Sequence, residues 1–422
     1  MPRPVASSSF SRNESGNLTI IFGLSLLVFV IAAGLGIDLA RVMDTKSRIV
    51  AAADAAALAA GRALQDGRLT DADVTSAAEK YFLANVANGK TPFGTVKDVA
   101  ATLDRSSGAV TVSANADVKM TLTAVAGFGT ITVPVQSTAK FDSHDIELSL
   151  ALDVTGSMGG NKIRALKTAT RDLVEMLLPD GGTPNKVRIA LAPYSSGVNA
   201  GNLANVATNG RSTGCTFERE GTDPAGDQAP STGNFLKSQG YGGVPAGATC
   251  PSTSKVIALT TDKRSLLDSV DAYGASGSTA GHVGVAWASY LVSPNWASAV
   301  GGASAPAAYR DGKTIKAVVL MTDGLFNTLA GIHYGDSSPE AAQSQQTAKS
   351  ICQGLRDNGV TVYTVGFKLK DISSQSQRAA AAQTLVDCAG SDLRYFDADD
   401  PTSLRDAFVA IAKQLNNLRL TQ

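Results

Sequence analysis

The chain has 422 residues and a mass of 43.3 kDa, and its 37 Lys and Arg residues balance its 37 Asp and Glu residues, which leaves no formal net charge. This balance argues against a nucleic-acid-binding protein that depends on a basic surface. Hydrophobic residues make up 44% of the chain and charged residues 18%, which excludes a wholly disordered protein. The length allows roughly two or three domains with at least one sizeable core.

An uncharged apolar run near the N-terminus, Leu18 to Ile37, has the length of one membrane span. It is longer than the apolar region of a cleavable signal peptide, about 7 to 15 residues, so we expect a retained anchor. Basic residues occur on both sides of the run, at Arg3, Arg12, Arg41, Lys46 and Arg48. The positive-inside rule therefore does not decide the orientation of the span.

Beyond the run, Asp38 to Leu64 consists almost wholly of helix-forming residues and should extend the same helix outward. A second helix is expected over Thr70 to Asn85. Polar and apolar residues then alternate, as in Ala109 to Val118 and Ile131 to Phe141, which is typical of half-exposed antiparallel strands. The sequence thus predicts a transmembrane and extended helix over residues 1–64 and a small α+β unit over residues 65–144.

From residue 145 onward, short apolar strands alternate with helical segments. The strands are expected at Ile146–Asp153, Val187–Tyr194, Ile315–Asp323 and Val360–Phe367, and the helices at Lys162–Leu178, Ala280–Val292, Pro339–Asn358, Ser376–Cys388 and Pro401–Leu418. Strands this apolar, separated by helices, predict an α/β fold with a doubly wound, mostly parallel sheet over residues 145–422. A Gly-rich segment, Asn199 to Lys255, interrupts this rhythm as a long insertion that is a candidate for partner specificity.

The chain contains four cysteines, and none lies in a C-x-x-C pair. Cys215 and Cys250 bracket much of the insertion, whereas Cys352 and Cys388 lie in two expected helices. An even number of cysteines in these places suits two disulfides in an oxidising compartment, and the suspected pairing is Cys215 with Cys250 and Cys352 with Cys388. The alternative is four buried free thiols in a cytosolic protein.

Three polar clusters follow expected strands or precede expected helices, and they supply oxygen ligands. Asp153, Thr155 and Ser157 follow the first strand, Thr279 precedes the helix that begins near residue 280, and Asp323 ends the third strand. Ligands of an open α/β sheet bind at the carboxyl ends of its strands. Any one cluster could simply cap a helix, but three together favour a site for a hard cation, Mg²⁺ first and Mn²⁺ or Ca²⁺ as alternatives.

These clusters resemble the metal-ion-dependent adhesion site of the von Willebrand factor A domain, written D-x-S-x-S, then T, then D. Asp153, Thr155 and Ser157 match the first element, with Thr in place of the first Ser, and Thr279 and Asp323 match the other two. The resemblance implies a von Willebrand A, Rossmann-like fold. It also implies binding of a protein partner that donates an acidic side chain to the metal.

The N-terminal part carries a second resemblance. An apolar span followed by D-L-A-R (Asp38 to Arg41) and A-A-A-D-A-A-A-L-A-A (Ala51 to Ala60) is similar to Tad/Flp pilus-assembly proteins of the TadE/TadG type. TadG-like members place a von Willebrand A domain after this pilin-like helix. A prepilin peptidase site would have Glu five positions after Gly, but Ile21 follows Gly16, so a fixed anchor is expected rather than cleavage and polymerisation.

Together the resemblances imply a non-enzymatic, single-pass protein of the bacterial inner membrane. Its N-terminus would lie inside and its bulk in the periplasm or at the cell surface, and its partners would be envelope or pilus-machinery proteins. Two alternatives remain, a surface adhesin that works without a pilus and a metal-dependent hydrolase that uses Asp153 and Asp323. The hydrolase is disfavoured because no general base or nucleophile stands out near these two positions. None of His144, His282 and His333 has a Ser or Cys nearby at a nucleophile-like turn.

Overall fold

The computed structural model describes residues 15–65, 68–87, 89–104, 108–121, 123–127, 129–140, 144–180 and 186–421. Arg3, Arg12 and Phe141, considered above, lie outside these residues. The chain divides into two compact units, Met1–Phe141 and Asp142–Gln422.

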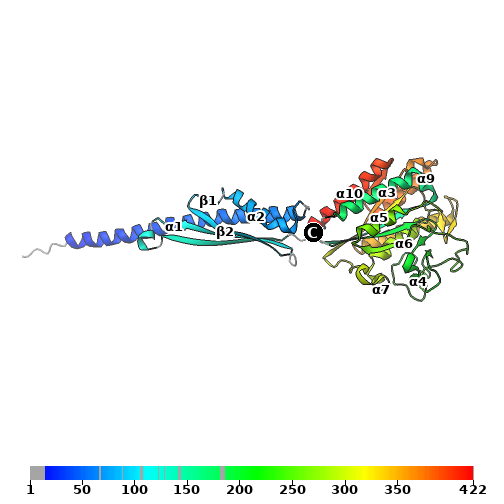
Figure 1. Cartoon of the computed structure of the whole chain (residues 1–422), viewed down its shortest axis with the longest axis horizontal. Helices are drawn as coiled ribbons and strands as arrows, with labels where there is room; N and C mark the ends of the chain where they lie inside the picture. The colour runs from blue at the N-terminus through cyan, green and yellow to red at the C-terminus, as the bar shows by residue number, and fades with distance from the viewer. Residues whose placement is uncertain are drawn as a thin grey trace, which may run out of the picture. The chain divides into compact units, whose positions relative to one another are not determined.

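One uninterrupted helix, α1 (Ser15–Gln65), covers both the apolar run and its predicted outward extension. Figure 1 shows that its first part projects free of the sheet of the same unit. Large apolar side chains from Ile20 to Leu39 are about half to three-quarters exposed around the helix, for example Phe29 at 72%. Within the described residues, α1 is the one helix whose length and composition would let it cross a membrane.

The second half of α1 packs on a small antiparallel sheet and on helix α2 (Asp71–Asn85). The sheet has the order β1-β2-β3-β4, formed by Lys90–Thr91, Gly94–Asp104, Ala109–Lys119 and Thr130–Lys140. Burial alternates along β3, which confirms the half-exposed pattern. Alanines of α1, including Ala53, Ala56 and Ala60, are fully buried, because their small side chains let the helix lie close to its neighbours.

The second unit is built on a large sheet with the order β14-β13-β10-β5-β6-β7-β8, and β9 also pairs with β6. Its strands are β5 (Asp145–Asp153), β6 (Val187–Tyr194), β7 (Val198–Asn199), β8 (Cys215–Thr216), β9 (Ile257–Thr260), β10 (Thr314–Thr322), β13 (Thr361–Phe367) and β14 (Tyr395–Ala398). The strands from β14 to β6 are parallel, and β7, β8 and β9 are antiparallel to their neighbours. This is a doubly wound, Rossmann-like arrangement, and the chain reverses its direction across the sheet between β5 and β10.

Helices cover both faces of this sheet, as a buried parallel sheet requires. One face carries α3 (Asn161–Leu177), α5 (Lys263–Asp271) and α10 (Pro401–Thr421), and α3 and α10 lie side by side (Figure 1). The other carries α6 (Gly281–Val292), α8 (Pro339–Asp357) and α9 (Gln375–Ala389). Every residue of α6 is buried, so this helix is the centre of its layer.

The expected strands and helices of this unit are confirmed, and the differences lie in its short elements. The short strands β7, β8, β9 and β14, and the antiparallel pair β11 (Thr328–Leu329) and β12 (Ile332–His333), were not expected as elements. Three of the four residues of β14 are not buried, so its sequence lacks the continuous apolar run that reveals a central strand.

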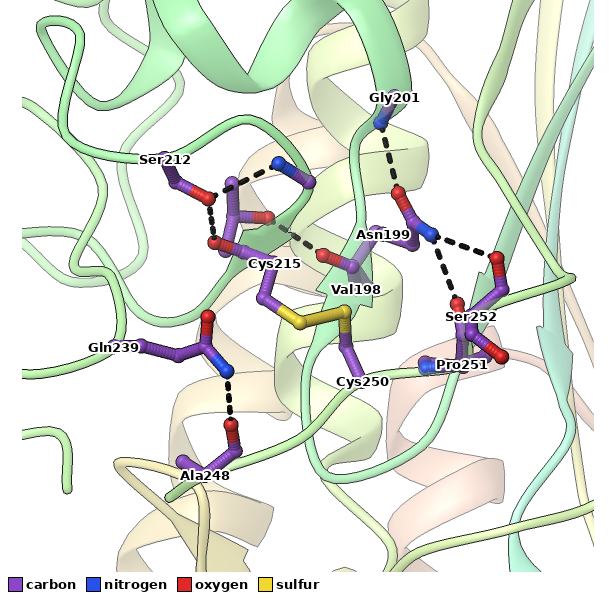
Figure 2. The surroundings of a disulfide bond; sticks show 12 residues. Val198, Asn199, Gly201, Ser212, Cys215, Gln239, Ala248, Cys250, Pro251 and Ser252 are labelled. Atoms are coloured by element: carbon purple, nitrogen blue, oxygen red, sulfur yellow. Dashed lines mark hydrogen bonds between the residues drawn. A yellow bond between two sulfur atoms is a disulfide. The ribbon is translucent and has the colours of Figure 1, made fainter. Parts of the chain in front are cut away.

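The insertion between residues 199 and 255 is held by a disulfide and by side-chain hydrogen bonds to the backbone. Cys215 and Cys250 are bonded, as Figure 2 shows, with 5.6 Å between their Cα atoms. The Asn199 side chain donates to the carbonyls of Pro251 and Ser252 at 3.0 and 3.2 Å (Figure 2). A polar segment with little regular structure is therefore fixed at its two ends.

A second disulfide, between Cys352 of α8 and Cys388 of α9, joins two helices of one layer. The structure therefore confirms two disulfides with the suspected pairing, and no described cysteine is free.

Candidate metal centre

The first side chain of the candidate site, Asp153, ends the central strand β5 and is fully buried. One of its carboxylate oxygens accepts a hydrogen bond from the backbone amide of Thr155 at 2.9 Å. The other accepts one from the hydroxyl of Thr322, the last residue of β10, at 2.7 Å. Because both oxygens are engaged, the carboxylate has a fixed orientation at the point where the sheet reverses its strand order.

Two hydroxyls connect the end of β5 with Asp323, which follows β10. The hydroxyls of Thr155 and Ser157 are 2.8 Å apart, and the Ser157 hydroxyl donates to Asp323 at 2.7 Å. The structure thus brings Asp153, Thr155, Ser157 and Asp323 into one hydrogen-bonded chain, although Ser157 and Asp323 are 166 residues apart.

The loop that carries Thr279 lies directly against the first loop. The Gly156 amide donates to the Gly277 carbonyl at 2.9 Å. Gly277 has φ +79°, and a Cβ there would come within 2.9 Å of the Ser196 hydroxyl, so the close approach requires glycine. Thr279 is buried; its amide donates to the Asn327 side chain, and its carbonyl accepts from the Asn327 amide. Among the described residues, no hydrogen bond joins the Thr279 hydroxyl to the other four candidate side chains.

The two carboxylates lie close enough to influence each other. Burial raises the pKa of Asp153 to about 7, and the negative charge of Asp323 adds to this increase. The ammonium of Lys162, in the first turn of α3, is 2.8 Å from the second oxygen of Asp323 and 3.6 Å from Asp371. Two buried carboxylates at one sheet edge therefore attract positive charge, and Lys162 supplies it to Asp323.

The donor set fits a hard divalent cation. It offers two carboxylates and three hydroxyls and no nitrogen or sulfur ligand, which suits Mg²⁺ better than zinc or copper. Within the described residues, no group of three or more His, Cys, Asp or Glu side chains is placed so that these groups alone could hold a metal ion. A metal bound here would therefore keep some of its coordination positions for water or for a ligand from another molecule.

Sequence reasoning left three residues of this centre out of the ligand set. Thr322 orients Asp153, Asn327 holds the Thr279 loop, and Lys162 pairs with Asp323. Thr322 belongs to the same strand-end cluster as Asp323, but its hydrogen bond to Asp153 was not predicted from the sequence. Lys162 could have been suspected from its position just after the first loop, but nothing in the sequence connects it with residue 323.

A second buried chain of polar groups joins the insertion to the helical layer. His282 of α6 contacts Glu218 of the insertion at 2.9 Å and Ser344 of α8 at 2.7 Å. Ser344 is fully buried. The Trp287 ring nitrogen also donates to Thr216 at 2.9 Å. These contacts hold the insertion against α6.

Comparison with known proteins assigns the N-terminal part. Residues 16–63 match the Tad family model, which describes TadE/G-like proteins of Flp pilus assembly. This segment is TadE/G-like. The match covers most of α1 and none of the second unit. No curated protein matches the chain.

Several solved structures are similar to this chain at low sequence identity. The von Willebrand domain of the type V pilus tip protein Mfa5 from Porphyromonas gingivalis is 14% identical, with a TM-score of 0.40, over 66% of this chain and 97% of that one. The pilus adhesin SpaC from Lactobacillus rhamnosus GG is 13% identical, with a TM-score of 0.40, over 78% of this chain. This chain spans about a third of SpaC, 34% of its length. Proximal thread matrix protein 1 from the mussel byssus, with a zinc-occupied adhesion site, is 14% identical, with a TM-score of 0.34, over 65% of this chain and 47% of that one.

Proposed function

We propose that this protein is a membrane-anchored envelope component of Tad/Flp pilus assembly that binds protein partners through a metal-ion-dependent adhesion site. The observation that carries the proposal is the meeting of three oxygen-bearing loops at the reversal point of the sheet, with Asp153 oriented by two hydrogen bonds. The TadE/G-like segment supports the pilus-assembly context.

The anchor is the apolar part of α1. Its exposed Leu, Ile, Val and Phe side chains would be covered by lipid, which removes their cost of contact with water. We place the span in the inner membrane with the N-terminus inside and the bulk in the periplasm or at the cell surface, where two disulfides form readily. Residues 1–64 would then serve as anchor, 65–144 as a supporting unit and 145–422 as the binding domain.

The residues that would hold the metal are Asp153, Thr155, Ser157, Thr279 and Asp323. When bound, a divalent cation supplies a coordination position that an acidic side chain of a partner can fill. Asp153 contributes a fixed carboxylate, and the Thr155 and Ser157 hydroxyls lie between it and Asp323. Binding, rather than catalysis, is the proposed activity, since Lys162, which contacts Asp323, is held as an ion-pair partner.

Calorimetric titration of Mg²⁺ and Mn²⁺ into the full-length protein in detergent tests the proposal. We expect binding by the natural protein and at least about a tenfold rise in Kd, equivalent to about 1.4 kcal/mol, for Asp153→Asn. The matched control is Asp268→Asn on the exposed face of α5, which should bind as the natural protein does. Absence of binding by the natural protein, or equal binding by Asp153→Asn, would contradict the metal site.

Partner capture is tested with the same variants. Envelope proteins retained by the immobilised natural protein in Mg²⁺ should be released by a chelator and should not be retained by Asp153→Asn. Retention of the same proteins by all variants, with or without Mg²⁺, would show that binding does not use this site. Digestion by protease added to intact cells would indicate a surface adhesin.

A further inference from the structure

One end of the first unit is built around Asp38, which directly follows the apolar run of α1. Asp38 is only 2% exposed. Its carboxylate accepts hydrogen bonds from the backbone amides of Thr121 and Thr123, at 3.2 and 2.8 Å, and from the Thr123 hydroxyl at 2.9 Å. Arg41, one helical turn further, is 3.7 Å from Asp38 and donates to the Thr121 hydroxyl. The connection between β3 and β4 is therefore fixed to α1 at the level of residue 38.

The turn between β1 and β2 lies at the same level. The Arg41 guanidinium lies over the Phe93 ring, 5.4 Å from its centroid. The Phe93 carbonyl accepts a hydrogen bond from the amide of Lys119, the last residue of β3. Two loops from different parts of the sheet thus surround α1 where its apolar run ends. Ile131 of β4 pairs with Val118, next to Lys119, and Lys90 lies in β1, just before this turn. We call the group made of Asp38, Arg41, Lys90, Phe93, Lys119 and Ile131 the Asp38 end.

The Asp38 end exposes apolar side chains beside the helix. Phe93 is 39% exposed and Ile131 41%, while Leu39 and Met43 of α1 are 50% and 61% exposed. Isolated apolar side chains are common on protein surfaces. Here, however, they continue the exposed apolar surface of the span past its last residue.

Among the described residues near the Asp38 end, some charged side chains form ion pairs and others do not. Asp44 is paired with Arg48, and Asp117 with Lys97. Lys90 and Lys119 are exposed, and no ion pair holds either of them within the described part of the chain. Exposed apolar and aromatic groups together with free lysines suit the headgroup layer of an anionic bilayer.

The helix geometry sets the depth of these groups. With a rise of about 1.5 Å per residue, Asp38 to Met43 extends only about 8 Å along the helix axis. The headgroup region on each side of the hydrocarbon core is about 5 to 8 Å thick. If the run ending at Ile37 fills the hydrocarbon core, both loops lie at headgroup depth.

We propose that the Asp38 end is a lipid-binding surface, which inserts Phe93 and Ile131 into the headgroup layer and places Lys90 and Lys119 against anionic phospholipids. This inference rests on the proposed membrane anchor. Asp38 can lie at such a depth because backbone amides, a hydroxyl and Arg41 satisfy its carboxylate.

Site-directed spin labelling of the full-length protein in bilayers tests this surface. The native cysteines are bonded in pairs, so a single introduced cysteine can be labelled. Four variants are compared, Val28→Cys in the span, Phe93→Cys and Ile131→Cys at the Asp38 end, and Thr102→Cys on an exposed position of β2. Thr102 is nine residues from Phe93, about 30 Å along an extended strand, and serves as the matched control.

The bilayers contain equal parts of phosphatidylcholine and phosphatidylglycerol, and the readout is collision with oxygen, which concentrates in lipid, or with a water-soluble nickel chelate. We expect labels at Phe93 and Ile131 to collide more with oxygen and less with the chelate than the label at Thr102. We also expect this difference to shrink in pure phosphatidylcholine, since Lys90 and Lys119 then lose their anionic partners.

The outcomes separate this inference from the anchor. A lipid-exposed label at Val28 with water-exposed labels at both Phe93 and Ile131 would overturn the inference and leave the anchor intact. A water-exposed label at Val28 would overturn the anchor and the inference with it. Labels at the Asp38 end that collide with neither oxygen nor the chelate would indicate that another part of the protein covers this surface. That outcome would contradict a lipid-binding surface. Equal collision rates in the two lipid compositions would show that Lys90 and Lys119 do not contribute to lipid binding.

Discussion

Lys162 is the residue whose charge bears most directly on the candidate metal centre. Its side chain is 19% exposed, whereas Asp323, its partner at 2.8 Å, has no exposed side-chain surface. An ammonium at this distance neutralises a carboxylate that a divalent cation would also use. A metal bound here would therefore compete with a cation that belongs to the chain itself.

Replacing Lys162 with Met should strengthen Mg²⁺ binding. We expect Kd to fall about tenfold, equivalent to about 1.4 kcal/mol, because the metal no longer displaces the ammonium from Asp323. Calorimetric titration measures the change. Lys167→Met is the control, since this lysine of the same helix bonds to the Asp271 carbonyl instead. Unchanged or weaker binding by Lys162→Met would show that the lysine does not compete with the metal.

Variants of Thr155 test whether Mg²⁺ binding depends on the hydroxyl of this residue or on the shape of its loop. Thr155→Val keeps the shape but removes the hydroxyl that meets Ser157, so Mg²⁺ binding should weaken at least about tenfold. The free energy of unfolding should fall by only about 1 kcal/mol, the usual contribution of one hydrogen bond. Thr155→Ser keeps the hydroxyl and should bind Mg²⁺ as the natural protein does. Equal Mg²⁺ affinity in all three proteins would exclude Thr155 as a ligand.

The two disulfides close loops of almost equal length, with sequence separations of 35 and 36 residues, but they join different kinds of structure. One joins two packed helices, and the other closes a segment with little regular structure. We expect removal of the Cys215–Cys250 bond by a double Ala substitution to make the insertion sensitive to protease. The unfolding free energy should fall by about 2 to 4 kcal/mol.

The matched control is the double Ala substitution of Cys352 and Cys388. It should lower stability by a similar amount and leave the insertion resistant, which mass spectrometry of limited digests would reveal. Cleavage within the insertion in both double variants, or in neither, would show that the first disulfide does not control its order.

The Glu218–His282 contact makes the attachment of the insertion sensitive to acid. Burial opposes the charged form of Glu218, but the hydrogen bond and the charge of His282 outweigh this and hold the pKa of Glu218 below its ordinary 4.5. A lowered carboxyl pKa contributes stability that is present above about pH 4.5 and is lost as the pH falls through the lower folded-state value.

Protease cleavage of the insertion should therefore increase as the pH falls below about 4.5. The variant Glu218→Gln should be cleaved more readily at neutral pH and should lose most of this pH dependence. Glu220→Gln, which affects a partly exposed pair with Arg211, provides the control and should retain it. The same acid response in Glu218→Gln as in the natural protein would assign the response to another group.

At the scale of the whole molecule, the two units have separate hydrophobic cores. The core of the first is formed by residues between Ile49 and Ala139, and the hydrophobic clusters of the second by residues between Ile146 and Leu415. A fragment of residues 142–422 should therefore fold alone and bind Mg²⁺ with a Kd within about twofold of the full-length value, a difference of less than about 1 kcal/mol.

Calorimetry compares the thermal unfolding and the Mg²⁺ binding of the fragment with those of the full-length protein. The unfolding transition of the fragment should coincide with one transition of the full-length protein in detergent. A fragment that fails to fold, or that folds and loses Mg²⁺ binding, would show that the second unit depends on the first.

Much of the fold could be predicted because the central strands β5, β6, β10 and β13 are almost wholly buried and their sequences are continuous apolar runs. The edge strands could not, since short, partly exposed segments lack that pattern. In the candidate site, the strand ends of a parallel sheet meet at one edge, so Asp153 and Asp323 could be expected near each other. The contact between Lys162 and Asp323 depends on the position of α3 and leaves no local trace in the sequence.

The pairing of β3 with β4 has a mechanical consequence. Eleven residues of each strand pair from Ala109 and Lys140 to Lys119 and Thr130 without a register shift. Inter-strand hydrogen bonds of an antiparallel ladder run perpendicular to the strands. A pull on Lys140 along β4 therefore loads the whole ladder in shear, so that its bonds share the force instead of breaking one after another. The strand through which the chain leaves the first unit is thus arranged to withstand tension.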